Sequence, residues 1–301
     1  MFKNILVPLD GSAMAEAALP AAAFLSKKFN AKVTLFHVVE KNAPREVHGQ
    51  PHLKNAEEAE AYLRDTARQA FEEGLPVAAH VHTTEVDNVA ESIVEHADEL
   101  DHDVIVMCSH GRGKALHLLL GSIAQKIVAK GSLPVLLIHP GKDGALPAFS
   151  CTALLLPLDG NPDHAQALPL AKELAKVCGS FLHLAVVIPH RGALSGNSAV
   201  TSRLLPGTMT ELLEMAIQDA DDYLRQQVEE LVREGFTASA HVLRGDPATV
   251  IGDAARQLEV DLVVMATHGK SGMEALWSGS VTHKVSSLSR VPLLLIPVGK
   301  K

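Results

Sequence analysis

Glycine, hydroxyl and acidic residues gather at two places in the sequence, each directly after an apolar segment. Asp10-Gly11-Ser12 is the first such place, and Ser109-His110-Gly111-Arg112-Gly113 is the second. Glycine lets backbone N–H groups approach an anion closely, and a helix start adds free N–H donors and the positive end of a dipole. An acidic side chain accepts hydrogen bonds from the hydroxyl or amine groups of a ligand. These residue types predict a site for a polyphosphate that carries a sugar or a base.

The same motifs occur again in the second half of the chain. The matched segments are Asn4–Ser12 with Ala153–Asn161, Asp103–Gly111 with Asp261–Gly269, Gly121–Ser122 with Gly279–Ser280, and Leu133–Ile138 with Val291–Ile296. Four matches in one order predict two homologous domains, at residues 1–140 and 151–299. The segment between them, 141–150, contains glycine and proline, which interrupt regular structure, and is therefore predicted to be a linker.

Apolar runs alternate with helix-like segments in each half. In the first half, strands are expected at Asn4–Leu9, Lys32–Val39, Val77–Thr83, Val104–Met107 and Val135–Ile138, and helices at Ala13–Phe29, Glu57–Glu73, Val86–Leu100 and Leu119–Lys130. Strands separated by helices predict an α/β fold with right-handed crossovers and a parallel sheet covered on both faces. Ligands of such sheets bind beyond the carboxyl ends of the strands, where both glycine-containing loops would lie.

Composition excludes several classes of partner. The 301 residues include 35 acidic and 27 basic ones, for a net charge of −8, so neither a nucleic acid nor a membrane surface is expected as a partner. No apolar run approaches the roughly 18–20 residues needed to cross a bilayer. Three cysteines, Cys108, Cys151 and Cys178, give no disulfide framework, and the first residues lack a signal-peptide pattern. A cytoplasmic protein is therefore expected.

At these residues the chain resembles the universal stress protein family in its tandem form. The nucleotide signature of that family is Gly, two residues, Gly, nine residues, Gly, then Ser or Thr. Nine residues separate Gly111 from Gly121, which Ser122 follows, and the second half repeats the pattern with Gly269, Gly279 and Ser280. The first glycine of the signature is replaced, by Cys108 in one half and by Ala266 in the other.

The resemblance implies two Rossmann-like (HUP-type) domains, each a five-stranded parallel sheet of order 3-2-1-4-5 with helices on both faces. It also implies ATP as the ligand, with or without Mg²⁺. Carried over position by position, the implied binding residues of the first domain are Pro8, Leu9, Asp10, Val38, Met107, Cys108, Gly111, Arg112, Gly121 and Ser122. Those of the second domain are Pro157, Leu158, Asp159, Val187, Met265, Ala266, Gly269, Lys270, Gly279, Ser280, Val281 and Thr282.

The two implied sites differ in their phosphate-binding hydroxyls. The second domain has the complete Ser280-Val281-Thr282, whereas the first has Ser122-Ile123-Ala124 and lacks the last hydroxyl. The second site is therefore expected to hold phosphates better.

Other chemistry has less support in the sequence. A P-loop needs glycine where Val264 stands, and the dinucleotide fingerprint needs glycine where Leu116 stands. The cysteines lack zinc spacing, and the sixteen histidines are interpreted as structural or adventitious. Cys108 and His110 have no evident third residue to orient them. No catalytic residue and no metal ligand is assigned, and any ATP hydrolysis is expected to be slow.

Two functions follow from these observations. The first is an ATP-binding regulator of a stress response. The alternative is an interaction scaffold with degenerate ligand loops, which signals by dimerisation or partner docking. The apolar edges Val135–Ile138 and Leu293–Ile296 are expected to pair inside one chain as an internal pseudo-dimer, with a homodimer of chains left open. The segment Pro189–Thr210 is either a mobile lid over the second site or a disordered insertion.

Overall fold

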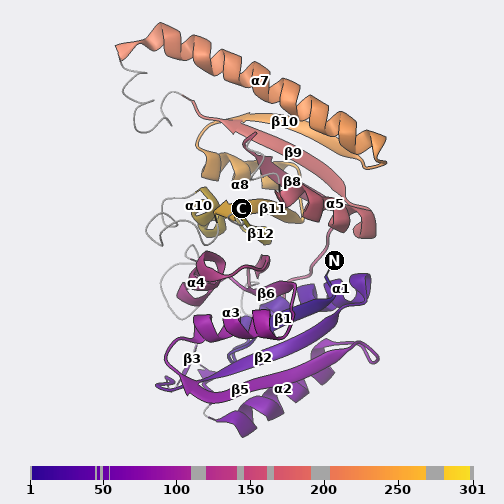
Figure 1. Cartoon of the computed structure of the whole chain (residues 1–301), viewed down its shortest axis with the longest axis vertical. Coiled ribbons are helices and arrows are strands. Elements are labelled where there is room, and N and C mark those ends of the chain that lie inside the picture. Colours follow the sequence, from indigo (N-terminus) through magenta and orange to yellow (C-terminus); the bar gives the residue numbers. More distant parts are fainter. Residues whose placement is uncertain are drawn as a thin grey trace. The chain divides into compact units, whose positions relative to one another are not determined.

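The computed structural model describes residues 2–44, 46–47, 50–53, 55–109, 120–140, 146–160, 166–190, 204–268 and 281–298. These residues form two compact units (Figure 1). The first unit contains the described residues up to Ser150 together with Thr267–His268 and Pro292–Val298. The second contains those of Cys151–Ala266 and Val281–Val291.

The first unit is built on a parallel sheet in the predicted strand order. Its strands are β1 (Asn4–Pro8), β2 (Lys32–Glu40), β5 (Val77–Val86), β6 (Val104–Cys108) and β7 (Val135–Ile138). They are ordered β5-β2-β1-β6-β7, which is the predicted 3-2-1-4-5. Every residue of β6 and β7 is buried, as continuous apolar runs covered on both faces predict.

The first unit includes one strand from the far end of the chain. β12 (Leu293–Val298) pairs antiparallel with β7, with Leu294 opposite Leu136. The predicted pairing of these two apolar segments is therefore confirmed. This pairing covers the outer edge of β7, the last parallel strand. A bare apolar edge at that position would promote aggregation.

Helices pack against each other in two pairs in the first unit. The helices are α1 (Leu19–Phe29), α2 (Ala56–Ala70), α3 (Val89–Glu99) and α4 (Ser122–Lys130). α1 contacts α2 and α3 contacts α4, and right-handed crossovers place the two pairs on opposite faces. A short 3₁₀ turn, η1 (Ala15–Ala18), precedes α1, so the helix begins later than the predicted Ala13.

A hairpin that the sequence analysis did not predict follows β2. Its strands are β3 (Glu46–Val47) and β4 (Gln50–Pro51). The Gln50 side-chain oxygen accepts a hydrogen bond from the Ala13 amide at 2.7 Å, which fixes the hairpin beside the turn after β1.

The second unit repeats the order of the first four parallel strands. Its strands are β8 (Ala153–Leu158), β9 (Phe181–Ile188), β10 (Ala238–Arg244) and β11 (Leu262–His268), parallel and ordered β10-β9-β8-β11. Its helices are α5 (Ala167–Cys178), α7 (Pro206–Arg233), α8 (Pro247–Gln257) and α10 (Val281–Leu288). The fold is thus α/β, as predicted.

α7 begins inside the segment for which a lid and an insertion were both considered. It starts at Pro206 and packs on β9 and β10, while residues 191–203 lie outside the described residues. Within the described ranges, no helix is both long and apolar enough to cross a membrane.

Candidate functional site

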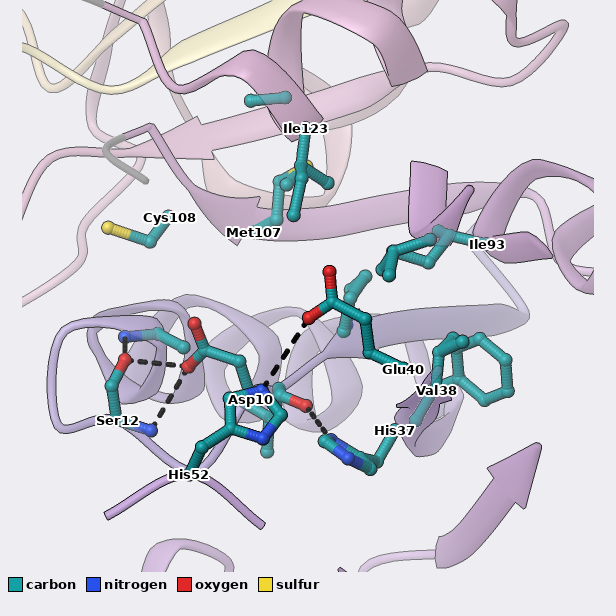
Figure 2. Close-up of a pocket in the computed structure, with 16 residues that line it drawn as sticks. Asp10, Ser12, His37, Val38, Glu40, His52, Ile93, Met107, Cys108 and Ile123 are labelled. Atoms are coloured by element: carbon teal, nitrogen blue, oxygen red, sulfur yellow. Dashed lines mark hydrogen bonds and ion pairs between the residues drawn. The ribbon is translucent and has the colours of Figure 1, made fainter. Parts of the chain in front are cut away.

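A cavity lies at the carboxyl end of the parallel sheet in the first unit (Figure 2). About 740 Å³ of space, part of which is open to solvent, lies among its lining residues. Six of the predicted site residues line it: Pro8, Leu9, Asp10, Val38, Met107 and Cys108. They lie in, or directly after, three neighbouring strands, β1, β2 and β6, so the fold brings together residues about 100 positions apart in the sequence.

Asp10 presents one carboxylate oxygen to its own turn and the other to the cavity. Oδ1 accepts hydrogen bonds from the Ser12 amide at 3.0 Å and from the Ser12 hydroxyl at 2.6 Å. No described residue donates a hydrogen bond to Oδ2, and Figure 2 shows this oxygen turned away from Ser12. The turn thus fixes the orientation of the carboxylate and leaves one oxygen to accept from a ligand hydroxyl or amine.

The backbone of β2 leaves the sheet ladder where Val38 lines the cavity. The β1–β2 ladder ends with a hydrogen bond from the Leu9 amide to the Phe36 carbonyl at 2.8 Å. His37 Nδ1 then donates to the Leu9 carbonyl at 2.7 Å, in place of a further bond from β2. On the other side, the register between β2 and β5 is irregular between Val38 and Glu40. Val38 therefore lies past the end of the ladder between β1 and β2, and next to the irregularity in the ladder between β2 and β5.

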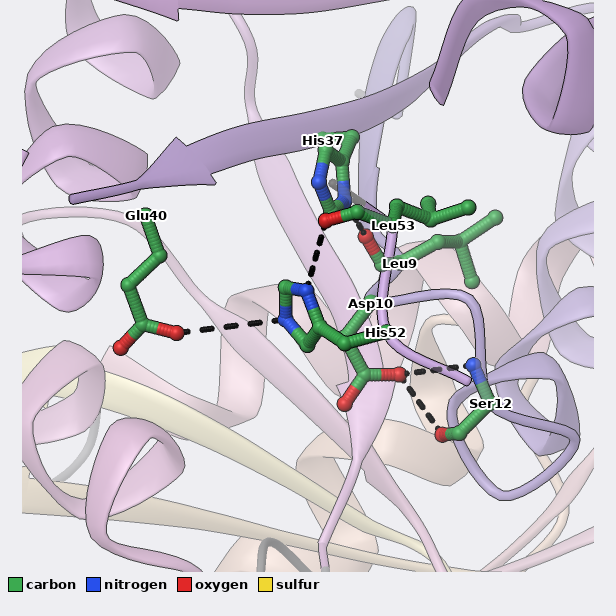
Figure 3. Close-up of polar contacts among 7 residues, drawn as sticks. All are labelled: Leu9, Asp10, Ser12, His37, Glu40, His52 and Leu53. Carbon is green, nitrogen blue, oxygen red and sulfur yellow. Dashed lines mark hydrogen bonds and ion pairs between the residues drawn. The ribbon is translucent and has the colours of Figure 1, made fainter. Parts of the chain in front are cut away.

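Three ionisable side chains meet at one wall of the cavity (Figure 3). His52, which follows the hairpin, donates from Nδ1 to the Leu53 carbonyl at 2.7 Å and lies 3.9 Å from the Glu40 carboxylate through Nε2. Its ring centroid is 6.1 Å from that of His37. Burial lowers the pKa of His37, so its ring is neutral near pH 7. Because Nδ1 carries the proton, Nε2 of His37 is an acceptor, and no described residue bonds to it.

The first turn of α4 forms another part of the wall. Gly121 is its N-cap, Ser122 is its first residue, and Ile123 and Ala124 line the cavity. The first N–H groups of a helix have no partner within the helix and lie at the positive end of its dipole. They favour an anionic group at this end of the cavity. Val89 and Ile93 of α3, the helix that α4 contacts, add an apolar part to the lining.

The predicted residues of the second unit lie at equivalent places in its sheet. Pro157 and Leu158 end β8, and Asp159 follows them, while Val187 lies in β9. Met265 and Ala266 lie in β11, and Val281 and Thr282 are the first residues of α10, where the Thr282 hydroxyl donates to the Ala266 carbonyl at 3.4 Å. The predicted glycine-loop residues lie outside the described residues: Gly111, Arg112, Gly269, Lys270, Gly279 and Ser280.

Two tyrosines near the acidic residues were missed in the sequence. The chain has only two, and Tyr62 precedes Val77 of β5 by the same number of residues as Tyr223 precedes Ala238 of β10. Burial, and then the charge and hydrogen bond of Glu16, raise the pKa of the Tyr62 phenol, and Asp10 adds a smaller effect. Burial, and then the charge of Asp159, raise the pKa of the Tyr223 phenol. Their equal spacing was the signal that could have revealed them. His52, by contrast, depends on the unpredicted hairpin.

Metal chemistry finds no support in the part of the chain that the structure describes. No group of three or more His, Cys, Asp or Glu side chains there is arranged to hold a metal ion.

Gly11 and Gly160 allow a test of how the hairpin supports the site. Both have left-handed backbones, with φ of 86° and 77°. A Cβ at Gly11 would lie 3.0 Å from Cγ of Leu53, whereas a Cβ at Gly160 would meet no atom of the described residues within 4 Å. Gly160→Ala should lower the free energy of unfolding by about 1–2 kcal/mol, and Gly11→Ala by about 1 kcal/mol more. Urea unfolding of both variants measures the difference. Equal losses in the free energy of unfolding would show that the Leu53 side chain moves aside without cost.

Comparisons with known proteins agree with the repeated fold. The model of the universal stress protein family matches residues 1–139 and again residues 152–297. A universal stress protein of Mycolicibacterium smegmatis is 27% identical over 311 residues, covering 97% of this chain and 96% of that protein. One from Synechocystis is 34% identical over 140 residues, covering 46% of this chain and 86% of that protein.

A solved structure shares the fold over the whole length. The crystal structure of a universal stress protein from Archaeoglobus fulgidus superposes with a TM-score of 0.71 at 18% identity, covering 99% of this chain and 98% of that one. The fold thus defines a tandem α/β protein with two Rossmann-like domains. With the family model matched twice, the chain belongs to the universal stress protein family.

Proposed function

We propose that the protein binds ATP, or a related adenine nucleotide, in the cavity of the first unit and at the equivalent place in the second. The observation that carries this proposal is the combination of groups around one cavity. Asp10 offers a carboxylate oxygen, and Val38 lies past the end of the ladder between β1 and β2. The start of α4 favours an anion.

Each part of the nucleotide has a partner of suitable chemistry in this arrangement. The apolar wall of Val38, Ile93 and Met107 suits a base, whose edge the backbone of β2 would bind. The Asp10 carboxylate would accept from ribose hydroxyls. The triphosphate would lie toward Gly121 and Ser122, with Mg²⁺ as a counter-ion supplied with the nucleotide.

Binding, rather than hydrolysis, is the proposed working event. In the cavity, His37 is engaged with the Leu9 carbonyl and His52 with the Leu53 carbonyl, and both lie at the wall near Glu40 rather than at the start of α4. We propose that nucleotide occupancy regulates a stress response in the cytoplasm. An internal pseudo-dimer of the two domains and a homodimer of chains stay predictions.

Calorimetry on nucleotide-stripped protein tests the proposal. We expect saturable ATP binding, and the mass spectrum of ligand released from freshly purified protein should contain an adenine nucleotide. Absence of both results would overturn ATP binding and favour the interaction scaffold with degenerate ligand loops.

A further inference from the structure

Cys151 and Cys178 meet at the amino-terminal edge of the sheet in the second unit. Cys151 lies two residues before β8, and Cys178 is the last residue of α5, just before the chain enters β9. The Cys178 side chain forms a hydrogen bond with the Cys151 thiol. Because the predicted ligand loops lie at the carboxyl ends of these strands, the two thiols are at the other edge of the sheet.

The backbone on both sides holds the two cysteines in this position. The Phe181 amide donates to the Thr152 carbonyl at 2.8 Å, and the Ser180 hydroxyl donates to the Cys151 carbonyl. The same hydroxyl lies 3.8 Å from the Cys151 sulfur. The β8–β9 ladder begins with Ala153 opposite Phe181, so these contacts bring the end of α5 close to the residues that precede β8.

The two thiols differ in their access to solvent. Cys151 is 1% exposed, whereas Cys178 is half-buried. Next to Cys178, a polar cleft is lined by Lys172, Lys176, Gly179 and Ser180 among others. A small reagent would therefore reach Cys178 first. The hydrogen bond to Cys178, and then burial, raise the pKa of the Cys151 thiol, so Cys151 remains protonated until its partner has reacted.

We propose that Cys151 and Cys178 form a redox-sensitive pair, which a hydroperoxide converts into an intramolecular disulfide and a small thiol reduces again. The Cys178 sulfur attacks one peroxide oxygen, the O–O bond breaks, and Cys178 becomes a sulfenic acid, while the other oxygen leaves as water with the Cys178 thiol proton. Cys151 then attacks the Cys178 sulfur, the S–O bond breaks, and the hydroxide leaves as water with the Cys151 proton. In total, two thiols are oxidised and one hydrogen peroxide is reduced to two waters.

The disulfide would close a loop that contains β8, Asp159 and α5. It would restrict the unfolded state of that segment and so stabilise the second unit without blocking the carboxyl edge of its sheet. This proposal is independent of nucleotide binding.

Peptide mapping of the full-length protein tests the pair. After treatment with hydrogen peroxide, we expect one peptide linking Cys151 to Cys178 and a loss of about 2 Da, the mass of two hydrogens, which dithiothreitol reverses. The melting temperature should rise by roughly 5–10 °C on oxidation. Cys178→Ser should abolish both changes, whereas Cys108→Ser should retain them.

Two outcomes on the wild-type protein would overturn the proposal. One is oxidation of Cys178 to a sulfinic acid with Cys151 unmodified. The other is a disulfide that links Cys178 of two chains, seen as a dimer on a non-reducing gel. Neither readout depends on a variant that must fold.

Discussion

Replacing Asp10 with asparagine is expected to weaken ATP binding in the first unit by about 10- to 100-fold, the usual value of one hydrogen bond to a charged group. The physical reason is that the two carboxylate oxygens have different partners: Oδ1 accepts hydrogen bonds from Ser12, and Oδ2 faces the cavity. Asparagine retains a carbonyl oxygen that can accept from the Ser12 amide and hydroxyl, as Oδ1 does. It places an NH₂ donor where Oδ2 would accept from the nucleotide. The turn should therefore be preserved while the ligand contact is lost.

Combining Asp10→Asn with the equivalent substitution in the second unit, Asp159→Asn, should weaken ATP binding by the whole protein further. Asp159→Asn should weaken the second site alone, and the double variant should show no saturable binding in calorimetry at ATP concentrations that saturate the wild type. Asp65→Asn is a matched control, because Asp65 is exposed on α2 and paired with Arg68. A double variant that binds like the wild type would exclude both acidic residues from the site.

Lowering the pH from 7.5 to 5.5 is expected to destabilise the protein strongly. Seven described histidines have a pKa below the ordinary value of 6.5, with burial as the largest cause: His37, His80, His82, His102, His183, His241 and His283. Each stays neutral in the folded chain down to its lowered pKa, so between that pKa and pH 6.5 it binds a proton on unfolding. Stability is therefore full above pH 6.5 and falls as the pH drops from there toward the folded-state pKa values.

The two most buried of these histidines are expected to contribute most to the loss of stability at low pH. His37 and His102 are 2% and 6% exposed, and each should add up to about 1.4 kcal/mol per pH unit to the loss. Thermal melts at a series of pH values measure the slope. His37→Asn, whose amide can still donate to the Leu9 carbonyl, should make the slope shallower. A slope that is unchanged in this variant would show that His37 binds its proton equally in both states.

Much of the fold could be predicted because its strands are short aliphatic runs. Asn4–Leu9 and Val135–Ile138 can be buried only between two layers, and the helices between such runs require parallel neighbours. Helix ends were less predictable. α4 begins at Ser122 rather than at the predicted Leu119, because Gly121 has an extended backbone and acts as the N-cap.

The predicted site residues of the first unit were placed by the repeat and by the family resemblance. The structure brings Asp10, Val38 and Cys108 to one cavity, and their role in binding stays a prediction. His52 could not be placed, since its position depends on the hairpin, where the Gln50 side chain accepts a hydrogen bond from the Ala13 amide. The contact between Cys151 and Cys178 was equally hidden, because it joins a helix end to a strand start.

The place of β12 has a consequence for how the chain can be divided. A fragment that stops at the linker would contain all five parallel strands of the first unit and lack the segment that borders β7. Its last strand would then offer open amide and carbonyl groups to any other chain. Expression of the amino-terminal half alone should therefore yield aggregates, and a synthetic peptide spanning Leu293–Val298 should restore its solubility by strand complementation.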